Sequence, residues 1–198
     1  MAELKILIEG YAKQAKSGWV ASSTTTLVKS NGKNIIVDPG CNRAKLLNSL
    51  KKKNLKAKDI DYIFLTHNHP DHVLLAGMFE NAKVIDELYV YCGDVITKHG
   101  GVIPGTDLKI IRTPGHMEEH CSLVVPARQG TYVVAGDVFW WLENEKQEVN
   151  ISRPDNDPEH MDLQKLIASR KKILEIADWV IPGHGKMFRV KANLNKIS

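Results

Sequence analysis

The sequence predicts an α/β fold in which sheets pack against each other and a few helices cover their outer faces. Apolar runs are short and rich in Val and Ile, which is typical of strands, and only two stretches show helical periodicity. The two halves of the chain share an order of several strands, a helix and a further strand that ends in a polar loop. Such a pattern predicts packed sheets with helices outside. We expect residues 1–198 to form one domain.

In the first half, three strands are expected at residues 4–8, 24–28 and 34–37. Apolar and charged residues alternate in the first of these, as in an edge or half-buried strand. Asn31-Gly32 marks a hairpin turn between the other two. Asn42 is then the expected N-cap of a helix, whose buried stripe should consist of Leu46, Leu47 and Leu50.

Later strands are expected at residues 61–65, 83–85, 88–91, 108–112, 122–125, 131–135 and 179–181. A second helix should begin at Asp157-Pro158-Glu159, which combines a cap, a first-turn proline and an early acid. Its buried stripe would consist of Leu163, Leu166, Ile167 and Leu174. The polar stretch 143–157 lacks periodicity, so we expect a long loop there, either a substrate lid or mobile surface.

Four of the expected strands run directly into residues of the kind that bind metals. Seven His and Asp residues follow these strand ends, namely His67, His69, Asp71, His72, His116, Asp137 and His184. Loops at the strand ends of a rigid sheet are where functional groups collect. Neutral imidazole and carboxylate are ligands that Zn²⁺ and similar divalent ions accept. The sequence therefore predicts a metal centre.

The stretch around His67 is the most informative of these. Residues two apart in extended backbone point the same way, so His67 and His69 can hold one ion together. Asp71 and His72 follow at once and can turn toward a neighbouring ion. A lone histidine such as His99 is better explained as ordinary packing or surface, but that explanation is poor for a cluster this dense.

In this order, the motifs resemble those of the metallo-β-lactamase superfamily. T-H-x-H-x-D-H begins at Thr66, T-P-G-H at Thr113, A-G-D at Ala135 and P-G-H at Pro182. Residues 37–40 resemble the family's D-x-G turn, so the resemblance covers nearly the whole chain. It implies a four-layer αββα sandwich.

The resemblance also implies a ligand set. One ion would be held by His67, His69 and His116, and a second by Asp71, His72 and His184. Asp137 would bridge them, as on the glyoxalase II, lactonase and ribonuclease Z side of the superfamily. We expect two divalent ions, zinc first, with manganese or iron as alternatives, and we expect Asp71 and Asp137 to act in catalysis. Two such ions activate water and stabilise a developing oxyanion. Asp38 is expected to contact a ligand histidine.

The chain departs from the family pattern in two places. Val73-Leu74-Leu75 stands where a glycine is common, and Glu118, Glu119 and His120 stand where small residues are usual. We interpret the latter three as loop surface rather than as proton donors, because geometry must precede any such role.

The substrate is open between several hypotheses. RNA phosphodiester cleavage leads, because part of the superfamily that this chain resembles is associated with ribonuclease activity. Trp140-Trp141 could stack bases, and basic runs lie at 51–53 and 170–172, although these Lys and Trp residues could equally belong to solvated helix faces and core. The alternative is a glyoxalase II-like or lactonase-like hydrolase of a small thioester, lactone or β-lactam, which predicts an apolar pocket. A third hypothesis is a non-hydrolytic metal-binding or iron redox protein.

Composition adds little about partners. The net charge of +4 is compatible with an anionic substrate without requiring one. Three widely spaced cysteines without a C-x-x-C pair predict a reducing compartment. With no leader or membrane-spanning pattern, we expect a cytoplasmic protein. A two-fold homodimer is the default assembly.

Overall fold

The strands form three sheets within residues 1–154 and 161–190, the part of the chain that the computed structural model describes. The larger sheet has the order β1 (Glu3–Ile8), β4 (Thr25–Ser30), β5 (Lys33–Val37), β6 (Tyr62–Phe64), β7 (Lys83–Ile85), β8 (Tyr89–Cys92) and β9 (Val95–Lys98). The second has the order β10 (Lys109–Arg112), β11 (Cys121–Ala127), β12 (Gly130–Trp140), β13 (Trp179–His184) and β14 (Phe188–Arg189). A separate hairpin consists of β2 (Tyr11–Gln14) and β3 (Trp19–Ser22).

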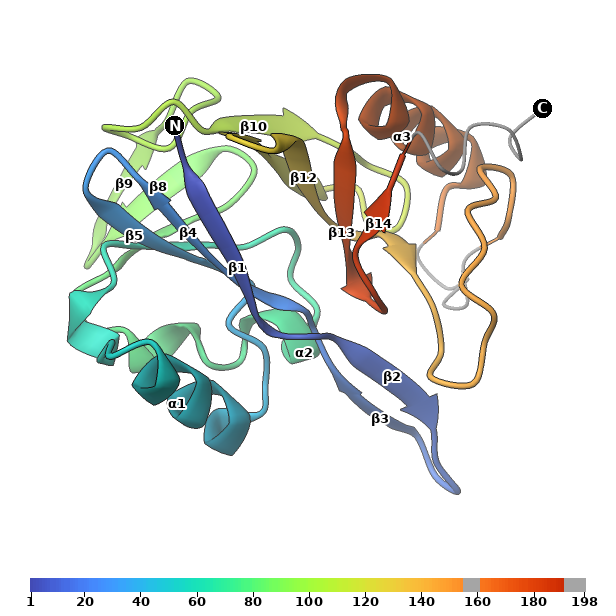
Figure 1. Ribbon diagram of the computed structural model, residues 1–198, viewed down its shortest axis with the longest axis horizontal. Helices are drawn as coiled ribbons and strands as arrows, with labels where there is room; N and C mark the ends of the chain where they lie inside the picture. The colour runs from blue at the N-terminus through green and yellow to red at the C-terminus, as the bar shows by residue number, and fades with distance from the viewer. Residues whose placement is uncertain (155–160, 191–198) are drawn as a thin grey trace.

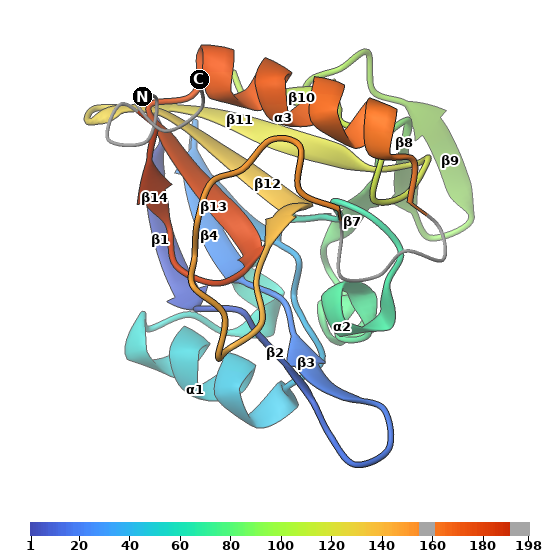
Figure 2. The ribbon, with the colours of Figure 1, turned by 90° about the vertical axis from the view of Figure 1, so that its right-hand side faces the viewer.

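Three buried clusters separate the layers of the fold. One lies between the two large sheets, where Val37 of β5 and Val134 of β12 both contribute. Another lies between the seven-stranded sheet and α1 (Arg43–Lys52), and the third lies between the five-stranded sheet and α3 (Leu163–Ile176). Figures 1 and 2 show α1 below one sheet and α3 above the other. The predicted αββα order of layers is confirmed.

Alternation along the strands explains why both faces of each sheet are apolar. In β5, Val37 faces the opposite sheet while Ile36 faces α1. Successive side chains of a strand point to opposite faces, so a strand between a sheet and a helix must be apolar throughout. These strands therefore read as short continuous apolar runs.

The predicted hairpin and N-cap are both present. Asn31 and Gly32 have φ of 48° and 76°, the left-handed pair that a tight turn between β4 and β5 requires. The Asn42 side chain accepts the N–H of Lys45 at 3.1 Å and begins α1. The expectation for Leu47 is wrong, because it lies on the solvent side of α1 and is 37% exposed.

The second helix begins later than expected. Asp157-Pro158-Glu159 lies outside the described residues, and α3 starts at Leu163 after Asp162, whose side chain accepts the N–H of Lys165. Leu166 and Leu174 are buried as predicted, but Leu163 and Ile167 are only partly buried. The remaining short helices are α2 (Pro70–Val73) and two 3₁₀ turns, Ala57–Asp59 and Ala76–Met78. Among the described residues, no helix has the length and apolarity needed to cross a membrane.

Four strands went unpredicted, namely β2, β3, β9 and β14. Each is at most four residues long, and its apolar run is too short to indicate a strand. The loop expected over 143–157 has no regular structure in its described part, residues 143–154. Val149 of this loop is buried with the α3 cluster, so that part is packed against the fold, and its role as a lid stays a prediction.

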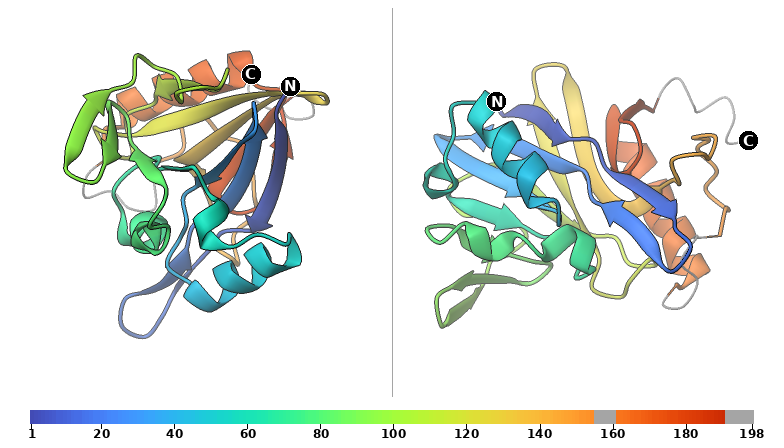
Figure 3. Two further views of the ribbon diagram at one scale, coloured as in Figure 1. Left: turned by 90° about the vertical axis from the view of Figure 1, so that its left-hand side faces the viewer. Right: turned by 90° about the horizontal axis from the view of Figure 1, so that it is seen from below.

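Strand direction explains why the ligand-type residues meet. In the five-stranded sheet, β10 and β12 each run antiparallel to β11, and β13 runs parallel to β12. The carboxyl ends of these three strands therefore share one edge. In the seven-stranded sheet, β5 and β6 are parallel and end at the same level. Figure 3 shows the two sheets packed face to face with the strand-end loops gathered along this edge.

Candidate metal centre

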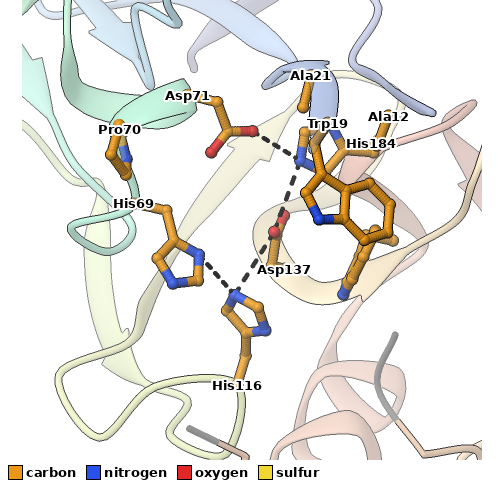
Figure 4. Close-up of a pocket in the computed structure, with 10 residues that line it drawn as sticks. Ala12, Trp19, Ala21, His69, Pro70, Asp71, His116, Asp137 and His184 are labelled. Atoms are coloured by element: carbon orange, nitrogen blue, oxygen red, sulfur yellow. Dashed lines mark hydrogen bonds and ion pairs between the residues drawn. The ribbon is translucent and has the colours of Figure 1, made fainter. Parts of the chain in front are cut away.

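The structure brings all seven predicted ligand residues together. His67 and His69 follow β6, and Asp71 and His72 lie on α2. From the other sheet, His116 follows β10, Asp137 lies in β12 and His184 ends β13. Figure 4 shows five of these side chains pointing into one pocket from both sides.

A first group consists of His67, His69, His116 and Asp137, whose nearest donor atoms all lie within 4.8 Å of one another. Nε2 of His116 is 3.0 Å from Nδ1 of His69 and 3.6 Å from Oδ2 of Asp137. Nε2 of His67 is 3.9 Å from the same Asp137 oxygen. Three imidazoles and one carboxylate thus face a common point, which is a donor set that Zn²⁺ accepts.

A second group consists of Asp71, His72 and His184, again with donor atoms within 4.8 Å. Nε2 of His184 is 3.2 Å from Oδ2 of Asp71 and 3.6 Å from Oδ2 of Asp137. Nε2 of His72 is 3.3 Å from Oδ1 of Asp137. The Asp137 carboxylate therefore lies between the two groups and is the residue that either ion could share.

Buried polar atoms test whether metal ions fit here. Nε2 of His67, Nε2 of His72 and Oδ1 of Asp137 are buried and make no hydrogen bond within the described part of the chain. Buried polar side-chain atoms without a partner are rare in native proteins because each costs desolvation energy. All three atoms are nitrogen or oxygen donors aimed at the centre. The residues present therefore fit two divalent ions.

A hydrogen-bond network behind the ligands fixes how two of the imidazoles are oriented. Oδ2 of Asp38 lies 2.8 Å from Nδ1 of His72 and accepts the Thr66 hydroxyl at 2.8 Å. That hydroxyl lies 3.0 Å from Nδ1 of His67. A proton on Nδ1 of each histidine would satisfy these contacts and would leave Nε2 to bind a metal ion. Asp38 has a φ of 48°, in the left-handed region that aspartate adopts more readily than most residues, and its carboxylate is held by Thr66 and His72.

His184 is oriented from another direction. Its Nδ1 lies 3.2 Å from the backbone oxygen of Tyr11, at the start of the β2–β3 hairpin. The same hairpin base is tied to the His184 loop by Gly185, whose N–H donates to the Gly10 oxygen at 3.1 Å. Gly10 has no room for a side chain, because a Cβ would lie 2.0 Å from the Gly183 oxygen. Close backbone packing thus couples the hairpin to the second ligand group.

The two groups differ in their electrostatics. Burial lowers the pKa of His67 and of His69, and neighbouring histidines lower them further. For His72 and His184, burial is again the largest single effect and lowers the pKa, but the neighbouring carboxylates together outweigh it: Asp137 and Asp38 for His72, and Asp137 and Asp71 for His184. The pKa of His72 consequently lies well above its usual value, and that of His184 is raised to about 9. Burial would raise the pKa of Asp137, yet His72 and His184 hold it well below its usual range.

One residue of the centre was misjudged from sequence. His120 was interpreted as loop surface, but it is fully buried, and burial lowers its pKa well below the usual value. Its Nε2 accepts the backbone N–H of Asp137 at 3.2 Å, and its Nδ1 lies 3.0 Å from the Thr113 hydroxyl. Its position directly before the buried strand β11 is the signal that could have indicated burial. Glu118 is exposed and pairs with Lys165, as the surface interpretation expects.

The pocket over the centre has a volume of about 410 Å³. Trp140 forms part of its wall and lies edge-on to the rings of His116 and His184. Across the opening, the β2–β3 hairpin contributes the small side chains of Ala12 and Ala21 and the half-exposed indole of Trp19. No Lys or Arg is among the described residues that line the pocket.

Two candidates for nucleic-acid contact have other roles. Trp141 packs in the buried cluster under α3, unlike its neighbour Trp140. Arg170, part of a predicted basic run, is buried and donates to the backbone oxygens of Val138 and Ile151. It therefore holds loop 143–154 against β12 instead of presenting its charge to solvent.

Known proteins share both the sequence and the fold. A profile described as "Metallo-beta-lactamase superfamily" matches residues 18–91. Metallo-beta-lactamase domain-containing protein 1 of Xenopus laevis is 33% identical over 196 residues, covering 93% of this chain and 80% of the relative. The chain belongs to the metallo-β-lactamase superfamily. Another superfamily relative, hydroxyacylglutathione hydrolase of Citrobacter koseri, is 32% identical over 134 residues, covering 62% of this chain and 46% of its own.

Solved superfamily structures agree on the fold. A metallo-beta-lactamase family protein from Thermus thermophilus has a TM-score of 0.68 at 19% identity, over 98% of this chain and 77% of its own. AidC, a dizinc quorum-quenching lactonase, has a TM-score of 0.57 at 18% identity, over 84% of this chain and 74% of its own. A protein in a di-iron-bound form has a TM-score of 0.62 at 18% identity, over 93% and 96%. Superfamily members thus hold dinuclear centres of zinc or of iron.

Proposed function

We propose that this protein is a dinuclear metal-dependent hydrolase of a small ester, thioester or lactone. The observation that carries the proposal is the Asp137 carboxylate between two ligand groups at the base of a pocket whose described lining residues include no Lys or Arg. The superfamily relatives with named activities include a hydroxyacylglutathione hydrolase and a lactonase, which supports this class of substrate.

In the proposed centre, His67, His69 and His116 would hold one ion, and Asp71, His72 and His184 the other, with Asp137 shared. Bound divalent ions would supply activation of water and stabilisation of negative charge on the substrate oxygen. Asp71 is the more exposed of the two carboxylates and lines the pocket, so its oxygen can accept the proton of the attacking water and return it to the leaving group. Trp19 and Trp140 would exclude bulk water beside the reacting bond.

The pocket walls support an uncharged substrate. Polyanions are usually bound by Lys or Arg side chains along their path, and the described lining residues include neither. Alanines and indoles instead suit a short acyl group or a ring packed beside the metal centre. A volume of about 410 Å³ is within the range of small-molecule sites.

RNA cleavage is a second proposal, favoured by one feature. The indole of Trp19 is 52% exposed at the pocket mouth, and the same hairpin carries the exposed Lys13 and Lys16. An exposed aromatic beside cations suits base stacking on single-stranded RNA. Lys13 is 3.7 Å from Glu143, so part of this charge is already balanced.

Parallel assays of the protein loaded with zinc, manganese or iron would decide between these proposals. Substrates would be a lactone, an acyl thioester, a β-lactam and labelled single-stranded RNA. His69→Ala and Asp137→Ala should abolish the relevant activity, whereas His99→Ala, a matched histidine outside the centre, should leave it unchanged. Hydrolysis of RNA alone would replace the first proposal with the second. Bound iron without hydrolysis of any substrate would overturn both and favour a redox protein.

A further inference from the structure

The β8–β9 hairpin has an unpaired edge at one end of the seven-stranded sheet. β9 pairs only with β8 in the described part of the chain, and all four of its residues are exposed. Val95 and Ile96 are 56% and 59% exposed, although both are β-branched strand formers. Figure 2 shows β9 at the outer border of the molecule. Exposed apolar edge strands are usually blocked or paired with another strand.

The turn of the hairpin determines which backbone groups of β9 point outward. Cys92 and Val95 are paired across a two-residue turn whose first residue, Gly93, has a φ of 62°. In such a turn the flanking residues form a hydrogen-bonded pair, so Val95 bonds to β8 and the next residue bonds outward. Ile96 and Lys98 therefore present their N–H and C=O groups to the free edge.

Those outward groups are complementary to a second copy of themselves. If two β9 strands run antiparallel around a two-fold axis at Ile96, Ile96 pairs with Ile96 of the second copy and each Asp94 lies beside the other copy's Lys98. The Ile96 pair is then hydrogen-bonded on both sides, as the alternation requires. Cross-strand pairs carry side chains on the same face, so each isoleucine contact is flanked by opposite charges. Neither Asp94 nor Lys98 has an ion pair among the described residues.

We propose that β9 is the homodimer interface of this protein, joining two seven-stranded sheets edge to edge through a two-fold axis at Ile96. The occupant is a second copy because a two-fold axis at Ile96 places Asp94 of each copy beside Lys98 of the other. No other two-fold register of β9 pairs these two opposite charges. An isologous two-fold contact of this kind closes on itself and stops at the dimer.

Charge reversal tests this interface without removing any residue of the metal centre. Asp94→Lys places two lysines beside each other at each end of the interface, and Lys98→Asp places two aspartates there. Each single variant should weaken dimerisation by about tenfold or more, measured by sedimentation velocity across a concentration series. The double variant, Asp94→Lys with Lys98→Asp, should restore the wild-type dimer.

Mixing supplies a second, independent readout. The Asp94→Lys and Lys98→Asp proteins pair opposite charges only with each other, so the mixture should dimerise more tightly than either protein alone. Lys5→Asp, a matched reversal on β1 at the opposite edge of the same sheet, should have no effect. A wild-type protein that is monomeric up to about millimolar concentration, or a dimer unchanged in both single variants, would overturn the proposal. Hydrolytic activity should be unaltered in all these variants.

Discussion

The two ligand groups of the metal centre are built from different chemistry although they share Asp137. The first is rich in imidazole, and burial lowers the pKa of His67 and His69. The second contains Asp71 and is bordered by Asp38, and its two histidines have raised pKa values. In the metal-free protein His67 and His69 are therefore neutral at pH 7, whereas His184 already carries a proton where an ion would bind.

This difference predicts stepwise loading. A cation entering the first group meets bare nitrogen atoms and one carboxylate. A cation entering the second must displace protons from His72 and His184, so its apparent affinity depends on pH. The carboxylates compensate by favouring any positive charge, whether proton or metal. The second group thus releases protons when it binds a metal ion, whereas the first group binds a metal ion without releasing protons.

Removing one histidine from each group should have the largest effect. We expect His116→Ala and His184→Ala each to retain about one ion per chain and to reduce kcat/KM by about three orders of magnitude, because hydrolysis needs both ions. Metal content by atomic emission together with steady-state rates would test this. The variants should differ in the ion that remains, with His184→Ala keeping the one whose binding is insensitive to pH. Two ions retained in either variant would contradict the assignment of groups.

The next largest effect should be a difference between the two ligand groups in how their metal affinity depends on pH. His184 is protonated below about pH 9 in the folded, metal-free protein. The second binding step should therefore tighten by about tenfold or more per pH unit between pH 6.5 and 9, with proton release, while the first step stays nearly constant. Zinc titration calorimetry in buffers of different ionisation enthalpy would measure both. Equal proton release in the two steps would show that the groups are not distinct.

As pH rises, the free energy of unfolding of the metal-free protein should fall, whereas the affinity of the second group for metal should rise. A histidine whose folded pKa is raised from 6.5 to about 9 stabilises the fold fully below pH 6.5, and that contribution is lost as pH rises through 9. The metal-free protein should thus unfold at lower temperature as pH rises across this window, while the loaded protein does not. His184→Ala should flatten the metal-free curve.

The residues behind the ligands allow a finer comparison. Asp38→Asn keeps a hydrogen-bond acceptor for His72 but removes its charge, so the second ion should bind about tenfold more weakly. Thr66→Val removes the hydroxyl that lies 3.0 Å from Nδ1 of His67 and should weaken the first ion instead. Competition with a metallochromic chelator would measure both affinities. Loss of the same ion in both variants would show that the network acts as one unit.

Much of this arrangement could be predicted because it depends on local sequence. Strand ends, the Asn31-Gly32 turn and the Asn42 cap are each determined by a few adjacent residues. The division of the seven ligands into two groups followed only from the family resemblance, because the spacing of residues along the chain does not show which strand-end loops lie beside each other. The structure brings the same two sets together, and their binding of metal stays a prediction.

What sequence could not provide was contact between distant segments. The hairpin of β2 and β3 is polar at its tip, yet its base lies against the His184 loop and its indole faces the pocket. Arg170 belongs by composition to a basic surface, but it lies on the buried side of α3 and donates to the backbone oxygens of Val138 and Ile151. His120 is the same kind of error, because its partners, Thr113 and the Asp137 backbone, lie on different strands.

His120 supports the smallest and most selective prediction. Its Nε2 accepts the Asp137 N–H, and its Nδ1 contacts Thr113. Gln has an oxygen near the position of Nε2, whereas Asn has its amide near that of Nδ1. His120→Asn therefore leaves the buried Asp137 N–H without an acceptor and should cost about 1–3 kcal/mol of unfolding free energy.

His120→Gln should cost less, since it retains the acceptor for Asp137. Because Asp137 lies between both groups, His120→Asn should weaken both metal-binding steps by a similar, several-fold factor, unlike Asp38→Asn or Thr66→Val. Denaturant unfolding of the metal-free proteins and zinc titration of each would test this. If Asn and Gln were equally tolerated, His120 would only fill space beneath the centre. A larger loss for Asn in both measurements would show that one buried imidazole positions the carboxylate on which both ligand groups depend.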